Sequence, residues 1–197
     1  MSIQRPKSNQ QIPGHAKRVF KGILFDTYQW EQEMYDGSKT IFEKLKRPDT
    51  VVVYPVLEDG KILMISDEQP LRSIRTIAPG GRVNKDEDIL DAAKRELLEE
   101  TGYTAKEFSL WYSGQPVTKI EWAVYVFIAK GLEKVHEQNL DAGEKIQLKA
   151  FSLDEFIENI VSGADFTDFD TRSKILEAKL DPQKMEELKE LFKPLGK

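Results

Sequence analysis

The sequence predicts an α/β protein in which strands surround one diagnostic helix and further helices follow at the C-terminal end. Three observations support this fold class. Short β-branched runs recur between residues 50 and 151, apolar residues between 87 and 101 repeat at helical spacing, and helix-capping patterns follow residue 151. We expect an N-terminal arm and β-hairpin in residues 1–47 and one globular domain in residues 48–197.

The first 47 residues have little apolar content with which to form a core. Residues 1–17 hold prolines, glutamines and serines, which predicts a poorly packed arm. Residues 19–30 and 40–45 are predicted strands around a turn at Asp36-Gly37-Ser38. A lone hairpin is marginally stable in water. We therefore expect the main domain or a second subunit to support it.

The middle of the chain predicts a sheet. Residues 50–57 (TVVVYPVL) and 61–66 are expected strands, and the turn Glu58-Asp59-Gly60 joins them. Further strands are expected at residues 108–113, 121–129 and 145–151.

The C-terminal part predicts three helices. Ser152 and Glu155 form a capping-box pattern for a helix that runs through Ile160 and ends at Gly163. Residues 168–180 are also expected to be helical. The last helix, 182–192, has Asp181 as its N-cap and proline at its first position.

The helix at 87–101 has an unusual polar edge. Its apolar stripe consists of Ile89, Leu90, Ala93 and Leu97. At roughly 100° per residue, Glu96 and Glu100 lie beside that stripe, and Glu99 lies beside Glu96. Clustered, half-buried carboxylates repel one another, so either their pKa values rise or cations neutralise them. Hard divalent ions such as Mg²⁺ are the natural partners of such oxygens.

The ends of this helix are also predicted. Asn84 and Glu87 form a capping-box pattern at its start, and Gly102 is expected to end it in a left-handed conformation. The turn Pro79-Gly80-Gly81 precedes it, where the backbone can approach a ligand closely.

These residues resemble a known motif. Gly81, Glu87 and the run RELLEETG (residues 95–102) occur at the spacing of the Nudix box, and only Tyr103 departs from it, in place of an aliphatic residue. The segments on both sides are similar to the ADP-ribose and nucleoside-diphosphate-sugar pyrophosphatases of the Nudix hydrolases. The resemblance implies a Nudix fold, an α/β/α sandwich with a mixed sheet, and an N-terminal hairpin that builds a homodimer.

The resemblance also implies roles for individual residues. Glu96, Glu99 and Glu100 would bind Mg²⁺, or Mn²⁺ in its place, together with the Gly80 carbonyl. Glu87 has two open roles, a cap or a metal contact through water. Arg95 would hold a glutamate in place, or simply pair with Asp91 or Glu99 at helical spacing.

Substrate contacts are expected outside the box. Arg72 and Arg75 could meet phosphates, with ordinary surface placement as the alternative. Trp30 could stack on a base or pack in a core or interface. Glu144, in the loop before the strand at 145–151, is the expected general base, with Asp141 as the other candidate and a solvated loop charge as the alternative.

Composition excludes several classes of function. The net charge of −5 argues against a nucleic-acid partner. There is no cysteine for disulfide or thiol chemistry, and His15 and His136 are too far apart in sequence to predict a zinc site. No apolar run is long enough to cross a membrane and no secretory signal is visible, so we expect a cytoplasmic protein without a membrane partner.

The resulting hypothesis is Mg²⁺-dependent hydrolysis of the diphosphate linkage of a nucleoside diphosphate sugar, either ADP-ribose-like or carrying a hexose. The products would be a nucleoside monophosphate and a sugar phosphate. Two alternatives stay open: hydrolysis of a dinucleoside polyphosphate or another nucleoside diphosphate derivative, and a nucleotide-sugar-binding regulator without turnover.

Overall fold

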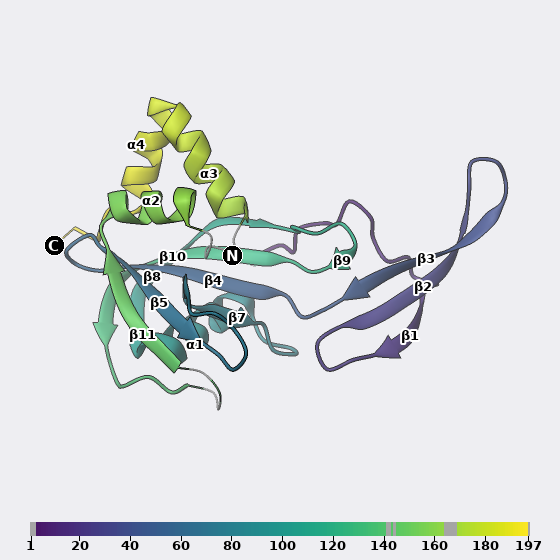
Figure 1. Ribbon diagram of the computed structural model, residues 1–197, viewed down its shortest axis with the longest axis horizontal. Helices are drawn as coiled ribbons and strands as arrows, with labels where there is room; N and C mark the ends of the chain where they lie inside the picture. The colour runs from purple at the N-terminus through teal and green to yellow at the C-terminus, as the bar shows by residue number, and fades with distance from the viewer. Residues whose placement is uncertain (1–2, 141–142, 144, 164–168, 197) are drawn as a thin grey trace.

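The computed structural model describes residues 3–140, 143, 145–163 and 169–196. Within these residues the chain forms two mixed β-sheets and four helices (Figure 1). The larger sheet lies between helices on both of its faces, and the smaller sheet extends to one side (Figure 1). The α/β class and the α/β/α arrangement expected from the sequence are confirmed.

The larger sheet has seven strands. Its main path follows the order β11-β5-β4-β10-β8, while β6 pairs with β5 and β7 pairs with β4. The strands are β4 (Thr50–Val56), β5 (Ile62–Glu68), β6 (Arg75–Ile77), β7 (Gly80–Arg82), β8 (Tyr103–Gly114), β10 (Val124–Lys134) and β11 (Lys145–Phe151). Only β4 and β10 run parallel among these pairs. The short strands β6 and β7 connect the sheet to the helix that follows them.

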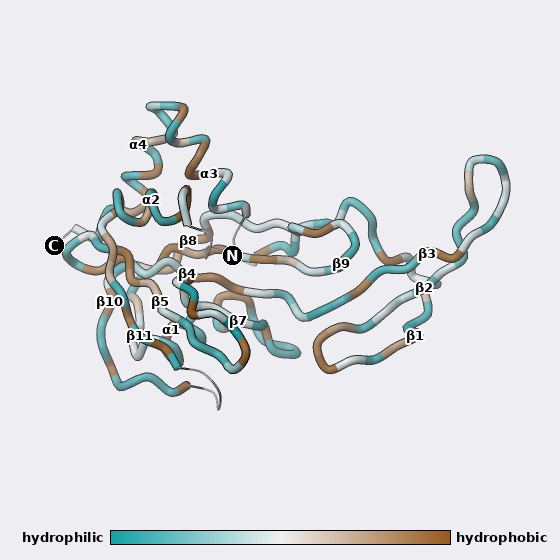
Figure 2. The backbone as a smooth tube through the Cα atoms, viewed as in Figure 1, coloured by the Kyte–Doolittle hydropathy of each residue, from teal (hydrophilic) through white to brown (hydrophobic). Residues whose placement is uncertain are grey.

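Helices cover the two faces unequally. Helix α1 (Ile89–Thr101) buries Ala92, Ala93 and Leu97 against one face, where Val51 and Val53 belong to the same cluster. On the other face, α2 (Leu153–Ser162), α3 (Phe169–Leu180) and α4 (Pro182–Leu191) pack in a second cluster that includes Tyr54 and Phe156. Successive side chains of β4 point to opposite faces of the sheet, so this one strand contributes residues to both core clusters. Hydrophobic stretches along the central strands are visible in Figure 2.

The local capping signals of the C-terminal helices are confirmed. The Ser152 hydroxyl accepts from the Glu155 backbone N–H while the Glu155 carboxylate accepts from the Ser152 backbone, and Gly163 follows the last turn of α2. Asp181 caps α4, with proline at its first position. Residue 168, the expected start of α3, lies outside the described residues.

The N-terminal sheet has the order β1-β2-β3-β9. Strands β2 (Asp26–Glu33) and β3 (Lys39–Lys46) form the expected hairpin, with Gly37 at φ 80° in its turn. The prediction of one strand over 19–30 is wrong. Strand β1 (Lys17–Lys21) ends where the Gly22 N–H donates to the Phe25 carbonyl, and the chain turns back into β2.

Strand β9 (Ile120–Glu121) was also not expected as a separate element. It pairs in parallel with β3 and so joins the N-terminal sheet, although it lies between two long strands of the larger sheet in sequence. The single strand expected at 121–129 is therefore divided between the two sheets.

The expectation of a poorly packed N-terminal arm is also wrong. Ile3 packs against the core cluster beneath α1, and Ser8 is buried. Arg5 forms a two-pronged ion pair with Asp49, at 2.8 and 2.9 Å, and a third contact with Glu121 at 2.6 Å. The arm is held by charge pairing at the junction of the two sheets, which its polar composition does not reveal.

A buried lysine completes this junction. The Lys44 ammonium donates to the Ser8 hydroxyl at 2.6 Å, to the Gln10 carbonyl, and to Glu121 at 3.0 Å. Its side chain has no exposed surface. Among the helices within the described ranges, none is long and apolar enough to cross a membrane.

Candidate active site

Helix α1 begins four residues later than the capping-box pattern suggested, with its N-cap at position 88 rather than 84. Asp88 is the N-cap, and its side chain accepts from the Leu90 N–H. Asn84 and Glu87 still interact, because the Asn84 N–H donates to the Glu87 carboxylate at 2.8 Å. This contact closes the loop before the helix rather than capping it. At the other end Gly102 has φ 73° and caps the helix as predicted.

Arg95 organises the polar edge of α1. Its Nε and Nη2 donate to the two oxygens of Glu87 at 2.7 and 3.0 Å, and Nη2 also donates to the Arg82 carbonyl. Its Nη1 donates to Glu96 at 2.8 Å and to Glu99 at 3.0 Å. One guanidinium thus bridges three carboxylates, so both open roles of Arg95, holding a glutamate and pairing at i,i+4 spacing, are realised together. Asp91 pairs instead with Lys94.

Glu100 is fixed by the backbone of strand β7, which the structure has where a turn was expected at Gly80 and Gly81. Its carboxylate is buried and accepts from the Gly80 N–H at 2.7 Å. The helical geometry that placed it beside the apolar stripe is therefore confirmed. The same hydrogen bond holds strand β7 against the end of α1.

Gly81 leaves room for a second carboxylate. A Cβ at this position would lie 2.5 Å from Cδ and 2.6 Å from Oε2 of Glu96. The absence of a side chain at 81 is thus what allows Glu96 to lie against β7. Glu99, in contrast, is the most exposed of the three, with 39% of its side-chain surface accessible.

The environment shifts the pKa values of two carboxyl groups, Glu96 and Glu87, in opposite directions. Burial raises the pKa of Glu96, and the hydrogen bond from Arg95 offsets only part of this effect. For Glu87 the hydrogen bonds from Arg95 outweigh burial and lower its pKa. Glu87 is therefore a stably charged partner of Arg95, whereas Glu96 carries a charge that lacks full compensation.

The donor set matches a hard divalent cation in chemistry. Glu96, Glu99 and Glu100 offer carboxylate oxygens from one helix edge, and the glycine turn leaves space beside them. Within the described ranges, no three Asp, Glu, His or Cys side chains converge as a metal-holding group. The reason is visible in the contacts, since Arg95 draws Glu96 and Glu99 toward itself while Glu100 turns to the Gly80 amide.

Arg72 and Arg75 lie together near the end of β5. Both approach the buried Asp67, with 3.9 Å from its Oδ2 to Arg72 Nη1 and 3.8 Å to Arg75 Nη2. These distances allow ion pairs but no direct hydrogen bonds. Asp67 Oδ1 and Arg75 Nε are buried without a hydrogen-bond partner. Sequence reasoning missed Asp67, whose position opposite Arg75 arises from the pairing of β5 with β6.

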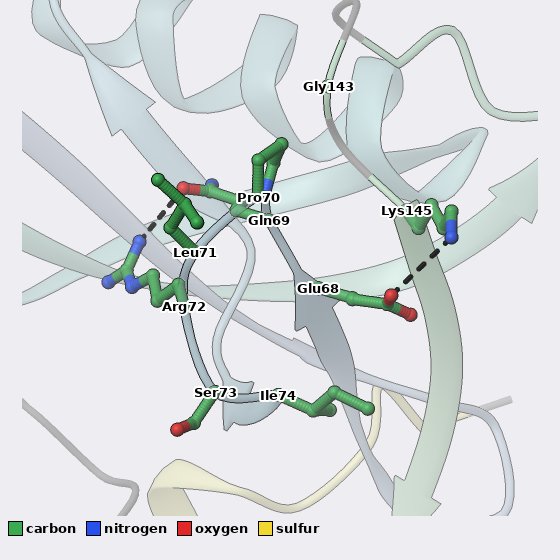
Figure 3. A pocket seen from close by; sticks show the side chains of 9 residues that line it. All are labelled: Glu68, Gln69, Pro70, Leu71, Arg72, Ser73, Ile74, Gly143 and Lys145. Atoms are coloured by element: carbon green, nitrogen blue, oxygen red, sulfur yellow. Dashed lines mark hydrogen bonds and ion pairs between the residues drawn. The ribbon is translucent and has the colours of Figure 1, made fainter.

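A cavity of about 880 Å³ opens beside Arg72. Its wall follows the loop from Glu68 to Ile74 and includes Gly143 and Lys145 (Figure 3). In this view the Arg72 guanidinium points to Gln69, whereas Glu68 points to Lys145 on the other side of the loop (Figure 3).

One expected site residue, Trp30, is not brought to this place. Trp30 is buried in the N-terminal sheet, where its ring contacts Phe42 and its Nε1 donates to Gln32. Of the two roles considered for Trp30, this environment corresponds to packing in a core rather than stacking on a base. Glu144 and Asp141 lie outside the described residues.

Comparison with known proteins identifies similar chains. The family model described as NUDIX domain matches residues 46–168. The chain is 30% identical over 161 residues to "ADP-ribose pyrophosphatase" of Bacillus subtilis (strain 168), covering 79% of this chain and 86% of that protein. It is 29% identical over 149 residues to "Methanol dehydrogenase activator" of Bacillus methanolicus, covering 74% and 80% respectively.

A solved structure has the same fold. The structure titled "Crystal structure of ADP compounds hydrolase" superposes with a TM-score of 0.68, at 19% sequence identity, over 93% of this chain and 98% of that one.

Proposed function

The chain belongs to the Nudix hydrolase family, and we propose that it hydrolyses the diphosphate linkage of a nucleoside diphosphate sugar with the help of Mg²⁺ or Mn²⁺. The observation that carries this proposal is the arrangement around Arg95, which joins Glu96 and Glu99 on one edge of α1 to Glu87 in the loop before it. A helix edge without a catalytic role would have no need to bury Glu100 against Gly80.

In the proposed reaction, Glu96, Glu99, Glu100 and the Gly80 carbonyl would hold the divalent ions. Such ions, when bound, polarise a phosphoryl group and lower the pKa of a water. The chain's own residues supply the rest. Arg95 holds Glu96 and Glu99 along the edge of α1, and the Gly80 amide holds Glu100; a bound metal ion would draw the remaining oxygens of these carboxylates together.

Arg72 and Arg75 are the proposed phosphate contacts. Their guanidinium groups are near Asp67 but form no direct hydrogen bond with it, which leaves donors free for an anion. The cavity beside Arg72 offers room for a small-molecule substrate. Trp30 is not part of the proposal, because within one chain its ring is already buried.

A nucleotide sugar of the ADP-ribose type is the preferred substrate. This preference rests on the relative named ADP-ribose pyrophosphatase and on the structure titled ADP compounds hydrolase. Glu144 is the proposed general base, by its place in the loop that leads into β11.

We further propose a homodimer in which the 1–47 region contributes to the interface. The β1–β2 turn exposes apolar side chains, with Phe20 61% and Ile23 102% accessible. Figure 2 shows this hydrophobic turn at the end of the N-terminal sheet that faces the larger sheet. An exposed apolar patch of this kind is typical of an interaction surface. Residues 48–197 would then form the hydrolase domain of each subunit.

A panel assay tests the substrate. ADP-ribose, GDP-mannose, UDP-glucose and diadenosine polyphosphates would be incubated with Mg²⁺, and phosphate release would be followed after phosphatase treatment. We expect the highest kcat/KM for ADP-ribose. Preferred cleavage of diadenosine polyphosphates would support the dinucleoside alternative.

A binding regulator is the second candidate, because one relative carries the name methanol dehydrogenase activator. Tight binding of a nucleotide sugar by calorimetry, without turnover of any panel member at saturating Mg²⁺, would favour this function over hydrolysis.

A further inference from the structure

A buried carboxylate, Asp67, adjoins the two arginines named above as phosphate contacts. Its side chain is 5% exposed, and on β5 it lies opposite Arg75 of β6 and Ile146 of β11. Successive side chains of a strand point to opposite faces of the sheet. Because Ile62 and Met64 of β5 pack in the cluster with α2, Asp67 lies on the face that α1 covers. This is also the face that carries the carboxylates of the candidate active site.

The contact between Asp67 and the arginines has an unusual geometry. Arg75 Nη2 and Arg72 Nη1 approach the same oxygen, Oδ2, at 3.8 and 3.9 Å. A direct pair between a guanidinium and a carboxylate would join two nitrogens to two oxygens by hydrogen bonds. Among the residues that the structure describes, Asp67 Oδ1 and Arg75 Nε are buried and make no hydrogen bond. The carboxylate thus attracts both arginines through its charge and leaves their donors unoccupied.

The position of Asp67 separates it from a ligand in the neighbouring cavity. Arg72 belongs to the wall of the 880 Å³ cavity, and Asp67 does not. The side chain of Arg72 is 41% exposed, and its Nη1 donates to Gln69 within the same loop (Figure 3). A phosphate in the cavity would therefore meet Arg72 directly, and Asp67 would act on it only through charge and through the arginines.

Asp67 has two opposite effects on such a phosphate. It gathers two like-charged guanidinium groups that would otherwise repel each other, which favours binding. It also repels the phosphate and compensates the charges that the phosphate would compensate. Two unit charges roughly 6 Å apart change a binding constant by about threefold in bulk water, and by more in a partly buried site. A phosphate can gather the arginines by itself, so the repulsive effect is the larger one.

The charge of the products makes this effect relevant to turnover. Each phosphate within a diphosphate linkage carries one negative charge, whereas a released phosphate monoester carries close to two at neutral pH. Two uncompensated arginines would consequently hold a product phosphate more strongly than a phosphate of the substrate. One buried carboxylate beside them reduces this difference.

Building on the proposed function, in which Arg72 and Arg75 contact phosphate, we propose that Asp67 is a positioning residue that sets the strength of that contact. It keeps both arginines at the edge of the cavity and weakens their hold on phosphate, so that a phosphorylated product can leave. Asp67 touches neither substrate nor metal and acts through the two guanidinium groups.

Steady-state kinetics with the preferred panel substrate and Mg²⁺ provide the first test. Asp67→Asn removes the charge, and KM and kcat should fall together because product leaves more slowly. The inhibition constant of the nucleoside monophosphate product should fall as well. Asp67→Glu keeps the charge and should lie closer to wild type than Asp67→Asn. A merely structural role predicts a raised KM or an unchanged inhibition constant, and either result would contradict the proposal.

Calorimetry with inorganic pyrophosphate in EDTA tests the same effect without metal or turnover. Asp67→Asn should bind pyrophosphate about tenfold more tightly than wild type at low ionic strength. Asp59→Asn removes the same charge in the β4–β5 turn, at the opposite end of β5, and is the matched control with no change expected. Arg72→Met should weaken binding, which assigns the bound pyrophosphate to this cavity.

The two measurements separate this inference from the proposed function. If no panel member is hydrolysed, the proposed function fails, and the pyrophosphate titration still decides the role of Asp67. Pyrophosphate binding by Asp67→Asn that is no tighter than that of wild type overturns the proposal, as does unchanged binding by Arg72→Met.

A second pair of variants covers the case in which Asp67→Asn does not fold. Arg75→Met is then compared with Arg75→Met/Asp67→Asn, which leaves no buried arginine without its counter-charge. The double variant should bind pyrophosphate several-fold more tightly than Arg75→Met. Equal affinities of these two variants would contradict the proposal.

Discussion

The carboxylate of Glu96 lies in the space that a side chain at Gly81 would occupy, 2.5 Å from Cδ of Glu96 to an ideal Cβ at position 81. The obstacle is the end of a flexible side chain, so Gly81→Ala should move the carboxylate and leave the fold nearly intact. We expect activity to fall about 10²-fold, as for other small misplacements of catalytic groups, with little change in Tm.

Gly80→Ala is the contrasting variant. A Cβ at Gly80 would meet the Val51 carbonyl and lie 2.9 Å from Val52 Cα, and this backbone cannot rotate away. We expect a loss of about 1–3 kcal/mol in unfolding free energy, measured by urea denaturation. Equal effects of the two alanines on stability would contradict the distinction.

Glu100→Gln tests the metal assignment. The glutamine oxygen can still accept from the Gly80 N–H, so the fold should persist, while a charged ligand is lost. Turnover at saturating Mg²⁺ should fall by about two orders of magnitude or more. Glu107→Gln, at an exposed position on β8, is the matched control and should behave as wild type. Undiminished activity of purified Glu100→Gln would exclude this residue as a ligand.

The N-terminal arm should contribute to stability in a pH-dependent way. Burial raises the pKa of Glu121, but hydrogen bonds from Arg5 and Lys44 outweigh it and lower the pKa below the usual 4.5. A carboxyl with a lowered folded pKa contributes stability above its unfolded pKa, and that contribution is lost as pH falls through the folded pKa.

Arg5→Met should therefore cost roughly 1–2 kcal/mol at pH 7, a value reduced by the partial exposure of Arg5. The difference from wild type should shrink as pH falls below about 4.5. Arg18→Met removes a more exposed pair and should change stability much less. Urea unfolding at several pH values measures the difference in unfolding free energy between wild type and Arg5→Met. If this difference does not change with pH, the ion pair with Glu121 does not account for the stabilisation by Arg5.

Sequence reasoning succeeded where a signal is local. The cap at Asp181, the capping box at Ser152 and the left-handed Gly102 depend on residues within a few positions, and all three are confirmed. The placement of Glu100 on the buried face followed from helical periodicity alone. The family resemblance added the three-layer arrangement, which periodicity does not specify.

Sequence reasoning failed where the residues that interact are distant in sequence. Arg5 lies 44 residues from Asp49 and 116 from Glu121, so nothing near the arm marks it as anchored. The start of α1 was misplaced because Asn84 and Glu87 do interact, but across a loop rather than at the helix end. Asp67 was missed because its meaning depends on strand pairing with Arg75.

The assembly prediction concerns residues 19–45. Their sheet buries Trp30 but exposes Val19, Phe20 and Ile41, so we expect a homodimer with this region in the interface. Light scattering at micromolar concentration should give twice the monomer mass of 22.6 kDa. Phe20→Ser with Ile23→Ser should shift the protein toward monomer while Tm changes little. A wild-type monomer would reject the prediction.

The last prediction concerns the general base. The loop that leads into β11 starts near the C-terminal end of α1, where the Asn139 N–H donates to the Glu99 carbonyl at 2.8 Å, and it reaches Lys145 opposite Glu68. The described residues on either side of Glu144, Asn139 and Lys145, thus lie at α1 and at the edge of the cavity beside Arg72. Glu144→Gln should reduce turnover by roughly 10²-fold or more with Mg²⁺ affinity nearly unchanged, as for a lost general base. Asp141→Asn is the matched control in the same loop and should do little. If Glu144→Gln is close to wild type while Glu99→Gln abolishes turnover but not metal binding, the base belongs to α1 and the loop only covers the site.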